Sequence, residues 1–169
     1  MTSLTSRKTS DSDQARMRRE RVLEVNERNI AAFRANGGRL PTFGDAPVLL
    51  LTTTGSRSGL RRTSPMMYLP DEHDDAVVYV FASAAGADQD PAWLANLVAH
   101  PDEVEVERGT AVSPARAEVV AEPRRSLLFD RQAALYPGFA HYQSKTTRVI
   151  PVVALTLRRP PEQVAGHRS

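Results

Sequence analysis

One short segment, Gly55-Ser56-Arg57-Ser58-Gly59-Leu60-Arg61-Arg62, concentrates residue types that bind anions. Glycines let backbone N–H groups turn toward a ligand, serine hydroxyls donate hydrogen bonds, and arginine presents a fixed, forked positive charge. Residues 41–109 contain 4 basic and 11 acidic residues, and three of the basic ones lie in this segment. The pattern predicts a site for a phosphate or a carboxylate. A solvated hairpin turn with surface arginines is the alternative, since short glycine motifs also arise by chance.

A second segment is rich in small residues and leads into a predicted helix. Ala82-Ser83-Ala84-Ala85-Gly86-Ala87 precedes Asp90-Pro91-Ala92-Trp93-Leu94-Ala95-Asn96. Small side chains allow a flat ligand to approach the backbone, and a helix N-terminus favours negative charge. Asp90 suits the N-cap and Pro91 suits the first turn. A linker followed by a tryptophan in the core is the alternative.

Aromatic residues form a third candidate region. Tyr136, Phe139 and Tyr142 follow helical i, i+3 spacing, so their side chains lie on one face. Such a stripe lines a pocket or packs in a core. Because a buried tyrosine hydroxyl needs a hydrogen-bond partner, two tyrosines in the stripe favour a pocket with polar groups.

Other catalytic chemistries find little support. The four histidines have no metal-ligand spacing, and the chain has no cysteine, which excludes disulfides, thiolate metal sites and cysteine nucleophiles. The string Gly55-Ser56-Arg57-Ser58-Gly59 resembles a hydrolase nucleophile motif, but arginine stands where the nucleophilic serine belongs. We therefore predict no metal site.

Composition and charge limit the class of protein further. The 169 residues are 41% hydrophobic and carry a net charge of +2, while aromatic residues make up 6%. The acidic middle of the chain and the few aromatic residues argue against nucleic-acid binding. No apolar run is long enough to cross a membrane, and no secretory signal is present. The sequence predicts a soluble cytoplasmic protein.

The elements that position these residues can be read from hydrophobic spacing and from glycine and proline breaks. We expect a disordered leader over 1–12, because this stretch is polar and rich in serine and threonine. A helix over 13–36 ends at Gly37-Gly38. The further expected elements are strands over 48–54, 61–69 and 76–82, a helix to about residue 100, a hairpin around Gly109, a helix over 122–135 and a strand over 149–157.

This order lacks the regular strand–helix–strand alternation of a doubly wound fold. It predicts an α+β, mainly β, single domain over 13–158: a small, largely antiparallel barrel with helices on its outside. The last residues, 159–169, are expected to form a tail.

Read together, the motifs resemble the deazaflavin (F420)-dependent nitroreductase and F420H2-dependent quinone reductase family. The resemblance covers about residues 25–157. It rests on the stretches Phe33-Arg34-Ala35-Asn36-Gly37-Gly38, Pro47 to Gly55, Pro91 to Leu97, Tyr142-Gln143-Ser144 and Arg148 to Val153. It implies a split β-barrel of the FMN-binding type. It also implies hydride transfer from reduced coenzyme F420 to a quinone, a nitroaromatic compound or an activated alkene.

The resemblance also implies roles for residues. The phosphate and polyglutamate tail of F420 would be held by Ser56, Arg57, Ser58, Gly59 and Arg62. The deazaflavin ring and its chain would lie along Pro65, Met66, Ala82, Ser83, Ala85, Gly86, Ala87, Trp93 and Asn96. The acceptor would contact Met67 and Phe139, and Ser83, Tyr136 or Tyr142 would hydrogen-bond the acceptor oxygen as charge develops there.

Three positions depart from the family pattern. Ala84 stands where many members have lysine, which removes one contact to an anion. Met67 and Phe139 stand where relatives that activate nitroimidazoles have tyrosine, which concerns the range of nitro substrates.

Two alternatives stay open. The chain could use FMN in the same fold, or it could carry F420 or an apolar ligand without catalysis. The expected partner is a small electron acceptor. The chain is expected to be a monomer or a homodimer, and the N-terminal helix leaves peripheral membrane contact open.

Overall fold

A single antiparallel sheet of seven strands forms the centre of the computed structural model, which describes residues 4–159, with side chains from residue 11 onward. Its strand order is β2-β1-β5-β6-β7-β4-β3, and every neighbouring pair is antiparallel. The strands are β1 (Val48–Thr54), β2 (Arg61–Met67), β3 (Leu69–Pro70), β4 (Val77–Phe81), β5 (Val104–Arg108), β6 (Ala111–Val119) and β7 (Val152–Leu157).

The connection between β2 and β3 forces this sheet to curl. These two strands lie at opposite edges of the sheet, yet only Tyr68 separates them along the chain. The edges can meet at Tyr68 only if the sheet bends round on itself. The sheet is therefore an open barrel, and the prediction of an α+β, mainly β, split barrel is confirmed.

Apolar side chains fill the inside of the curl and one outer face. The β1 residues are all buried, since β1 lies between two strands and under α2. The inner cluster includes Leu49, Leu51, Val78, Val80, Val106, Val153 and Leu155. A second cluster, with Tyr79, Phe81, Phe129, Phe139 and Val152, joins the outer face to the helices that follow β6.

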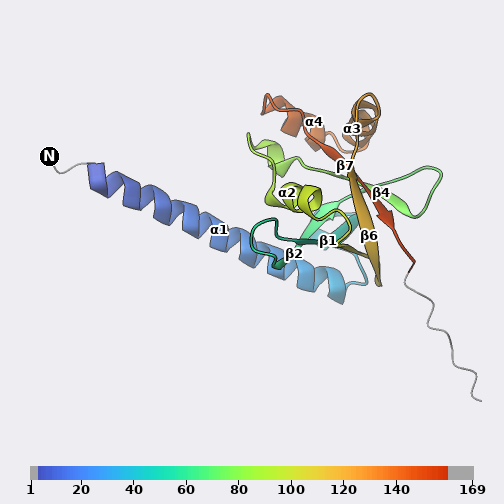
Figure 1. Cartoon of the computed structure of the whole chain (residues 1–169), viewed down its shortest axis with the longest axis horizontal. Coiled ribbons are helices and arrows are strands. Elements are labelled where there is room, and N and C mark those ends of the chain that lie inside the picture. Colours follow the sequence, from blue (N-terminus) through green and yellow to red (C-terminus); the bar gives the residue numbers. More distant parts are fainter. Residues whose placement is uncertain (1–3, 160–169) are drawn as a thin grey trace, which may run out of the picture.

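Helices cover the outside of the barrel (Figure 1). The shorter ones are α2 (Ala92–Ala99), α3 (Arg124–Leu135) and α4 (Gly138–Ser144), with 3-10 turns η1 (Pro41–Phe43) and η2 (Ala84–Gly86). Arg124 of α3 lies over the Tyr79 ring, and the Tyr79 hydroxyl donates to Asp71 at 2.5 Å. This hydrogen bond holds the pKa of the Asp71 carboxyl below its usual value, and burial raises the pKa of Tyr79.

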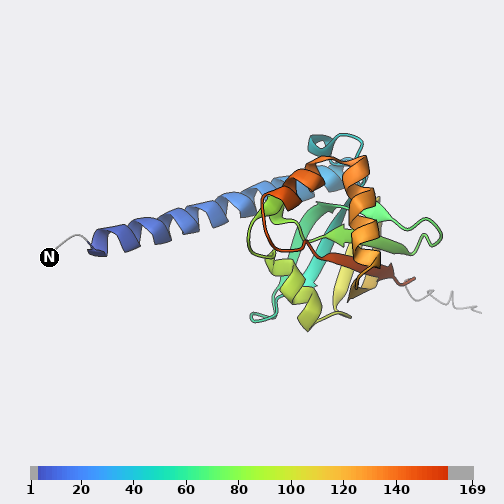
Figure 2. The ribbon, with the colours of Figure 1, turned by 90° about the horizontal axis from the view of Figure 1, so that it is seen from above.

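The first helix, α1 (Leu4–Ala35), extends far beyond the barrel, as Figures 1 and 2 show. Its C-terminal end is anchored by Phe33, which is buried with Leu40, Val48 and Leu50. Residues 11–25 are all exposed. Among the described residues, no helix is both long and apolar enough to cross a membrane.

Helix α1 corrects the prediction for the N-terminal leader. Residues 4–12, expected to be disordered, are helical. Residues 1–36 contain neither glycine nor proline, so nothing interrupts a helix that the arginine- and glutamate-rich stretch propagates. Residues 1–3, and the expected tail except Arg159, lie outside the described residues.

Most other elements occur close to their predicted positions. β1 has the predicted bounds, whereas the expected strand over 61–69 is divided at Tyr68 into β2 and β3. The three aromatic residues with helical spacing do not lie in one helix. Tyr136 follows the end of α3, whereas Phe139 and Tyr142 lie in a separate short helix, α4.

Two adjacent glycines end α1 in different ways. Gly37 has φ +65° with open space at its Cβ position, whereas Gly38 has φ +88° and lies against the hairpin between β5 and β6. A Cβ on Gly38 would lie 2.3 Å from the Cα of Gly109. The close approach of Gly38 therefore fixes where α1 meets the sheet.

We expect Gly38→Ala to destabilise the fold by about 2–5 kcal/mol, because it adds a steric clash to an unfavourable φ. Gly37→Ala, the matched control, adds only the φ penalty of about 1–2 kcal/mol. Urea unfolding of both variants measures the difference, and equal losses would contradict the close packing of Gly38 on Gly109.

Candidate active site

A cleft of about 730 Å³ opens between α1, β2, the η2 loop and α2. Side chains of β2 form one wall, where Arg62, Ser64 and Met66 alternate along the strand and so share a face. The segment over residues 82–90, which contains η2 and which we call the η2 loop, forms another wall with Ala84 and Ala85. The remaining lining residues are Arg19, Val22, Leu23, Asn26, Pro65, Phe81, Ser83, Pro91, Ala92, Trp93 and Asn96. We call this hollow the cleft.

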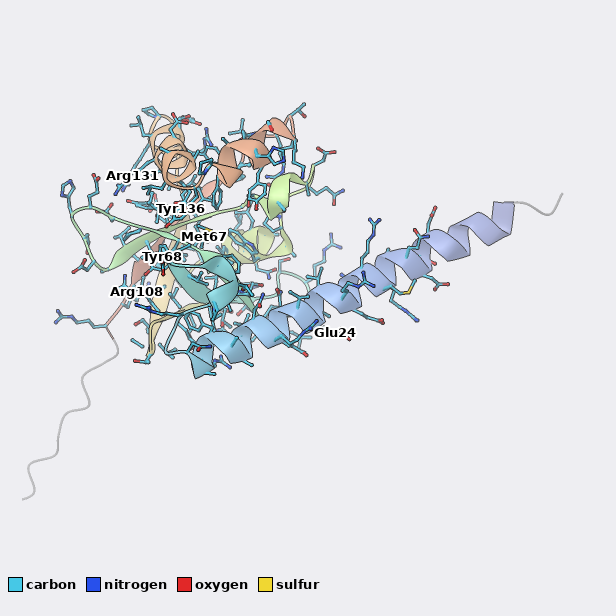
Figure 3. The ribbon with its side chains drawn as sticks, turned by 180° about the vertical axis from the view of Figure 1, so that it is seen from behind. Glu24, Met67, Tyr68, Arg108, Arg131 and Tyr136 are labelled. Carbon is cyan, nitrogen blue, oxygen red and sulfur yellow. The ribbon has the colours of Figure 1, made fainter. Side chains whose placement is uncertain are left out.

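A second hollow of about 460 Å³, the aromatic pocket, lies beside α4. Met67 follows Met66 on β2, so its side chain points to the opposite face of the strand. Figure 3 labels Met67 and Tyr136, which both line this pocket. The other lining residues are Thr42, Phe43, Asp45, Ala46, Gly138, Phe139 and Tyr142.

Three aromatic rings connect the two hollows. Phe81 lines the cleft and contacts Phe139 of the aromatic pocket edge to face, with 5.5 Å between ring centroids. Phe139 in turn contacts Tyr142 at 5.6 Å. The cleft and the aromatic pocket therefore share an apolar wall.

The turn between β1 and β2 is fixed to α2 through Asn96. The Ser56 N–H donates to Asn96 Oδ1 at 2.9 Å, and Asn96 Nδ2 donates to Thr53 Oγ1 at 3.0 Å. Asn96 is 8% exposed, and these bonds use both of its polar atoms. We therefore interpret Asn96 as the residue that positions the turn, although part of its surface borders the cleft.

The three arginines around this turn differ in their contacts. Arg61 Nη1 donates to Thr54 Oγ1 at 3.0 Å and to the Glu103 carbonyl at 2.7 Å. Arg57 and Arg62 form no hydrogen bond or ion pair with the described residues, and both are exposed. Arg62, which lines the cleft, and Arg57, on the turn beside it, are thus available to bind an anionic group.

Three residues with hydroxyl groups line the two hollows. Ser83 lines the cleft, and Tyr136 and Tyr142 line the aromatic pocket. All three side chains are partly buried, and none of the hydroxyls is hydrogen-bonded to a described residue. They can donate to an oxygen atom of a ligand.

The predicted site residues divide into two groups. The cleft and the aromatic pocket bring together Arg62, Pro65, Met66, Met67, Ser83, Ala85, Trp93, Asn96, Tyr136, Phe139 and Tyr142. Neither hollow is lined by Ser56, Arg57, Ser58, Gly59, Ala82, Gly86 or Ala87. The first four form the exposed turn beside the cleft, and Ala82 and Gly86 are buried in the wall behind it.

Sequence reasoning missed the contribution of α1 and of the η1 loop. Arg19, Val22, Leu23 and Asn26 line the cleft at i, i+3, i+4 and i+7, and Thr42 and Phe43 line the aromatic pocket. Among residues 4–159, no group of three or more histidine, aspartate or glutamate side chains is arranged to hold a metal.

Comparison with known proteins identifies the family. Residues 24–157 match the family model described as F420H(2)-dependent quinone reductase. The chain belongs to the F420H(2)-dependent quinone reductase family. The resemblance stated from the sequence, the oxidoreductase class and the dependence on reduced F420 are therefore confirmed.

Individual relatives agree with this assignment. The chain is 38% identical over 132 residues to F420H(2)-dependent quinone reductase Rv1261c of Mycobacterium tuberculosis, covering 72% of this chain and 80% of the relative. A solved F420-H2 dependent reductase, FDR-A, is 34% identical with a TM-score of 0.57, covering 64% of this chain and 93% of that one. A solved domain-swapped dimer is 31% identical with a TM-score of 0.58, covering 86% and 98%.

The free arginines give a test of where the F420 tail binds. We expect Arg57→Ala and Arg62→Ala each to weaken F420 binding about tenfold, because each removes a charge-assisted contact of roughly 1.5 kcal/mol. Fluorescence titration at several salt concentrations measures the loss and a shallower salt dependence. Arg61→Ala is the control: it removes contacts within the protein and should lower stability more than affinity. Unchanged F420 affinity in both Arg57→Ala and Arg62→Ala would place the tail elsewhere.

Proposed function

We propose that this chain oxidises reduced F420 by binding its deazaflavin ring in the cleft and the acceptor in the aromatic pocket. The observation that carries the proposal is the shared wall of Phe81, Phe139 and Tyr142, which sets the two hollows side by side. Transfer of a hydride requires donor and acceptor in contact, so the proposal requires the wall of Phe81, Phe139 and Tyr142 to move aside where the two ligands meet.

The residues of the cleft fit the cofactor. The ring of F420 is flat, and the Cβ-only side chains of Ala84 and Ala85 leave room for it opposite Pro65 and Met66. The anionic tail would extend toward Arg57 and Arg62, which have no partner among the described residues. When bound, reduced deazaflavin supplies two electrons as a hydride.

The protein's own groups would bind the acceptor and donate to its oxygen. Ser83 Oγ, Tyr136 Oη and Tyr142 Oη are hydrogen-bond donors without partners among the described residues. As an acceptor is reduced, negative charge develops on its oxygen, and a donor already aimed at that oxygen stabilises it. Met67, Phe139 and Phe81 would exclude water from the contact between the two ligands.

A quinone suits the aromatic pocket best. Its rim includes Met67 and Phe139, which offer apolar contact to a flat ring, while the tyrosines provide donors at the edge. Nitroaromatic compounds and activated alkenes share the flat shape and the developing oxygen charge, so we include them as further acceptors.

The direct test is a titration of the purified chain with F420 and with FMN, followed by oxidation of reduced F420 with menadione. We expect tight F420 binding and menadione-dependent oxidation. Preference for FMN, or F420 binding without oxidation, would contradict the proposal and support a flavin enzyme or a carrier.

We expect Ser83→Ala and Tyr142→Phe each to lower kcat about fivefold to tenfold, the loss of one neutral hydrogen bond of about 1 kcal/mol. Ser144→Ala is the control, since the Ser144 hydroxyl donates to the His141 carbonyl outside both hollows. Unchanged turnover in both Ser83→Ala and Tyr142→Phe would remove these hydroxyls from the reaction.

We further propose that the chain is a homodimer in which α1 packs on a second copy. The relative that forms a domain-swapped dimer supports this proposal. Exposed apolar residues of α1, such as Met17 (56% exposed) and Val25 (42%), also support it. A helix that packs on nothing is marginally stable in water, so a partner for residues 11–25 would stabilise α1.

We propose a cytoplasmic location as well, which the lack of cysteine favours.

Light scattering with size-exclusion chromatography tests the dimer. We expect a dimer for the full chain and a monomer for the double variant Met17→Glu, Val25→Glu, because buried charges oppose the contact. Glu24→Ala on the same helix is the control (Figure 3). A monomeric full chain that binds anionic vesicles through α1 would contradict the dimer and support membrane contact.

A further inference from the structure

A single arginine binds the whole loop that forms the alanine wall of the cleft. Arg148 lies between α4 and β7, and its side chain is 15% exposed. Its guanidinium donates to the carbonyls of Ala82 (3.0 Å), Ser83 (2.8 Å) and Ala87 (2.7 Å). It also donates to Asp90 Oδ1 at 2.8 Å. These bonds fix both ends of the η2 loop.

The contact with Asp90 corrects a sequence prediction. Asp90 was expected to cap α2, but the N-cap residue is Pro91, and no side chain caps this helix. The Asp90 carboxylate instead pairs with the guanidinium of Arg148. Asp90 thus stabilises the η2 loop through Arg148 and does not cap α2.

The η2 loop needs such support because its backbone is strained. Ala84 has φ 44° and Ala85 has φ 53°, in the left-handed region that costs an alanine roughly 1–2 kcal/mol. The loop also lies directly on α4: a Cβ on Gly86 would be 2.7 Å from the Tyr142 carbonyl oxygen. A loop with these angles keeps one conformation only when its surroundings determine it.

The bond to the Ser83 carbonyl also sets the direction of an N–H group. In a planar trans peptide, the Ala84 N–H points opposite to the Ser83 carbonyl, and therefore away from Arg148. Ala84 lines the cleft whereas Arg148 does not, and no described residue accepts a hydrogen bond from the Ala84 N–H. This N–H is therefore available to an oxygen atom of a ligand.

Arg148 is itself held by α4. Gln143 Nε2 donates to the Arg148 carbonyl at 2.7 Å, and Gln143 Oε1 accepts from the Ile150 N–H at 3.1 Å. Gln143 follows Tyr142, which lines the aromatic pocket. One chain of hydrogen bonds thus runs from α4 through Arg148 to Ser83.

We propose that Arg148 is a positioning residue that presents the Ala84 N–H to the cofactor ring and the Ser83 hydroxyl to the acceptor, in fixed register with Tyr142. The inference rests on the proposed function, because it assigns the cleft to that ring. Arg148 touches neither ligand. It acts by holding the loop, and its forked donors reach acceptors that a single lysine ammonium cannot satisfy together.

Hydrogen–deuterium exchange of the ligand-free protein tests the loop directly. We expect peptides covering residues 83–90 to exchange about tenfold faster in Arg148→Lys than in the unchanged protein, with no change in β1. Arg158→Met is the matched control, since among the described residues the Arg158 side chain pairs only with exposed Asp102. Unchanged exchange at 83–90 in Arg148→Lys would overturn the inference, whatever the enzyme activity shows.

Kinetics supply the second readout. We expect Arg148→Ala to lower kcat/KM for menadione about 100-fold, because it misplaces the reacting groups. Added guanidinium ion should then raise the kcat/KM of this variant at least about tenfold. Asp90→Asn keeps the three carbonyl contacts of Arg148, so it should lower kcat/KM less than Arg148→Ala does. Should Arg148→Ala fail to fold, Arg148→Lys and Asp90→Asn carry the same comparison.

The outcomes separate the two proposals. If the unchanged protein does not oxidise reduced F420, the proposed function fails, and the exchange experiment still decides whether Arg148 holds the loop. If the unchanged protein is active and Arg148→Lys matches it in both exchange and kcat/KM, the inference on Arg148 fails alone.

Discussion

The passage of the chain through Tyr68, from one edge of the sheet to the other, is the constraint on which the site depends. It makes β2 both an edge of the open barrel and the strand next to the closure point. Alternation along β2 then sends Met66 toward the cleft and Met67 toward the aromatic pocket. A single strand thus contributes to two hollows on its opposite faces.

The η2 loop and α4 complete this arrangement from the other side. The η2 loop follows β4 and lies on α4, and Phe139 and Tyr142 of α4 belong to the outer apolar cluster. The small residues that make the loop suitable for a flat ring also give it little packing of its own. Polar contacts from Arg148 replace the missing side-chain contacts, which explains why a strongly charged group lies mostly buried behind an alanine wall.

The sequence indicated local features well and long-range contacts poorly. The run of buried residues at 48–54 predicted β1 with its bounds, because every residue there is apolar or β-branched. Local patterns could not show that Arg61 is bound within the protein while Arg57 and Arg62 have no partner among the described residues. One of the two partners of Arg61 is a carbonyl 42 positions away. Sequence reasoning assigned Asp90 to a helix cap for the same reason: Arg148 is 58 positions distant.

The residues of α1 show a further limit. Val22 fits an apolar stripe, and a stripe predicts burial against the domain, yet Val22 is 59% exposed at the border of the cleft. Where α1 leaves the barrel depends on the approach of Gly38 to Gly109, which no local pattern reveals. The family resemblance predicted the residues of the candidate site, whereas contacts distant in sequence determine the walls of the cleft.

A crystal structure of the chain with oxidised F420 tests the central claim most directly. The account predicts the deazaflavin ring in the cleft against Met66 and Ala84, with the anionic tail at Arg57 and Arg62 and the aromatic pocket free beside it. A ring bound in the aromatic pocket, or a tail directed away from both arginines, would contradict the account.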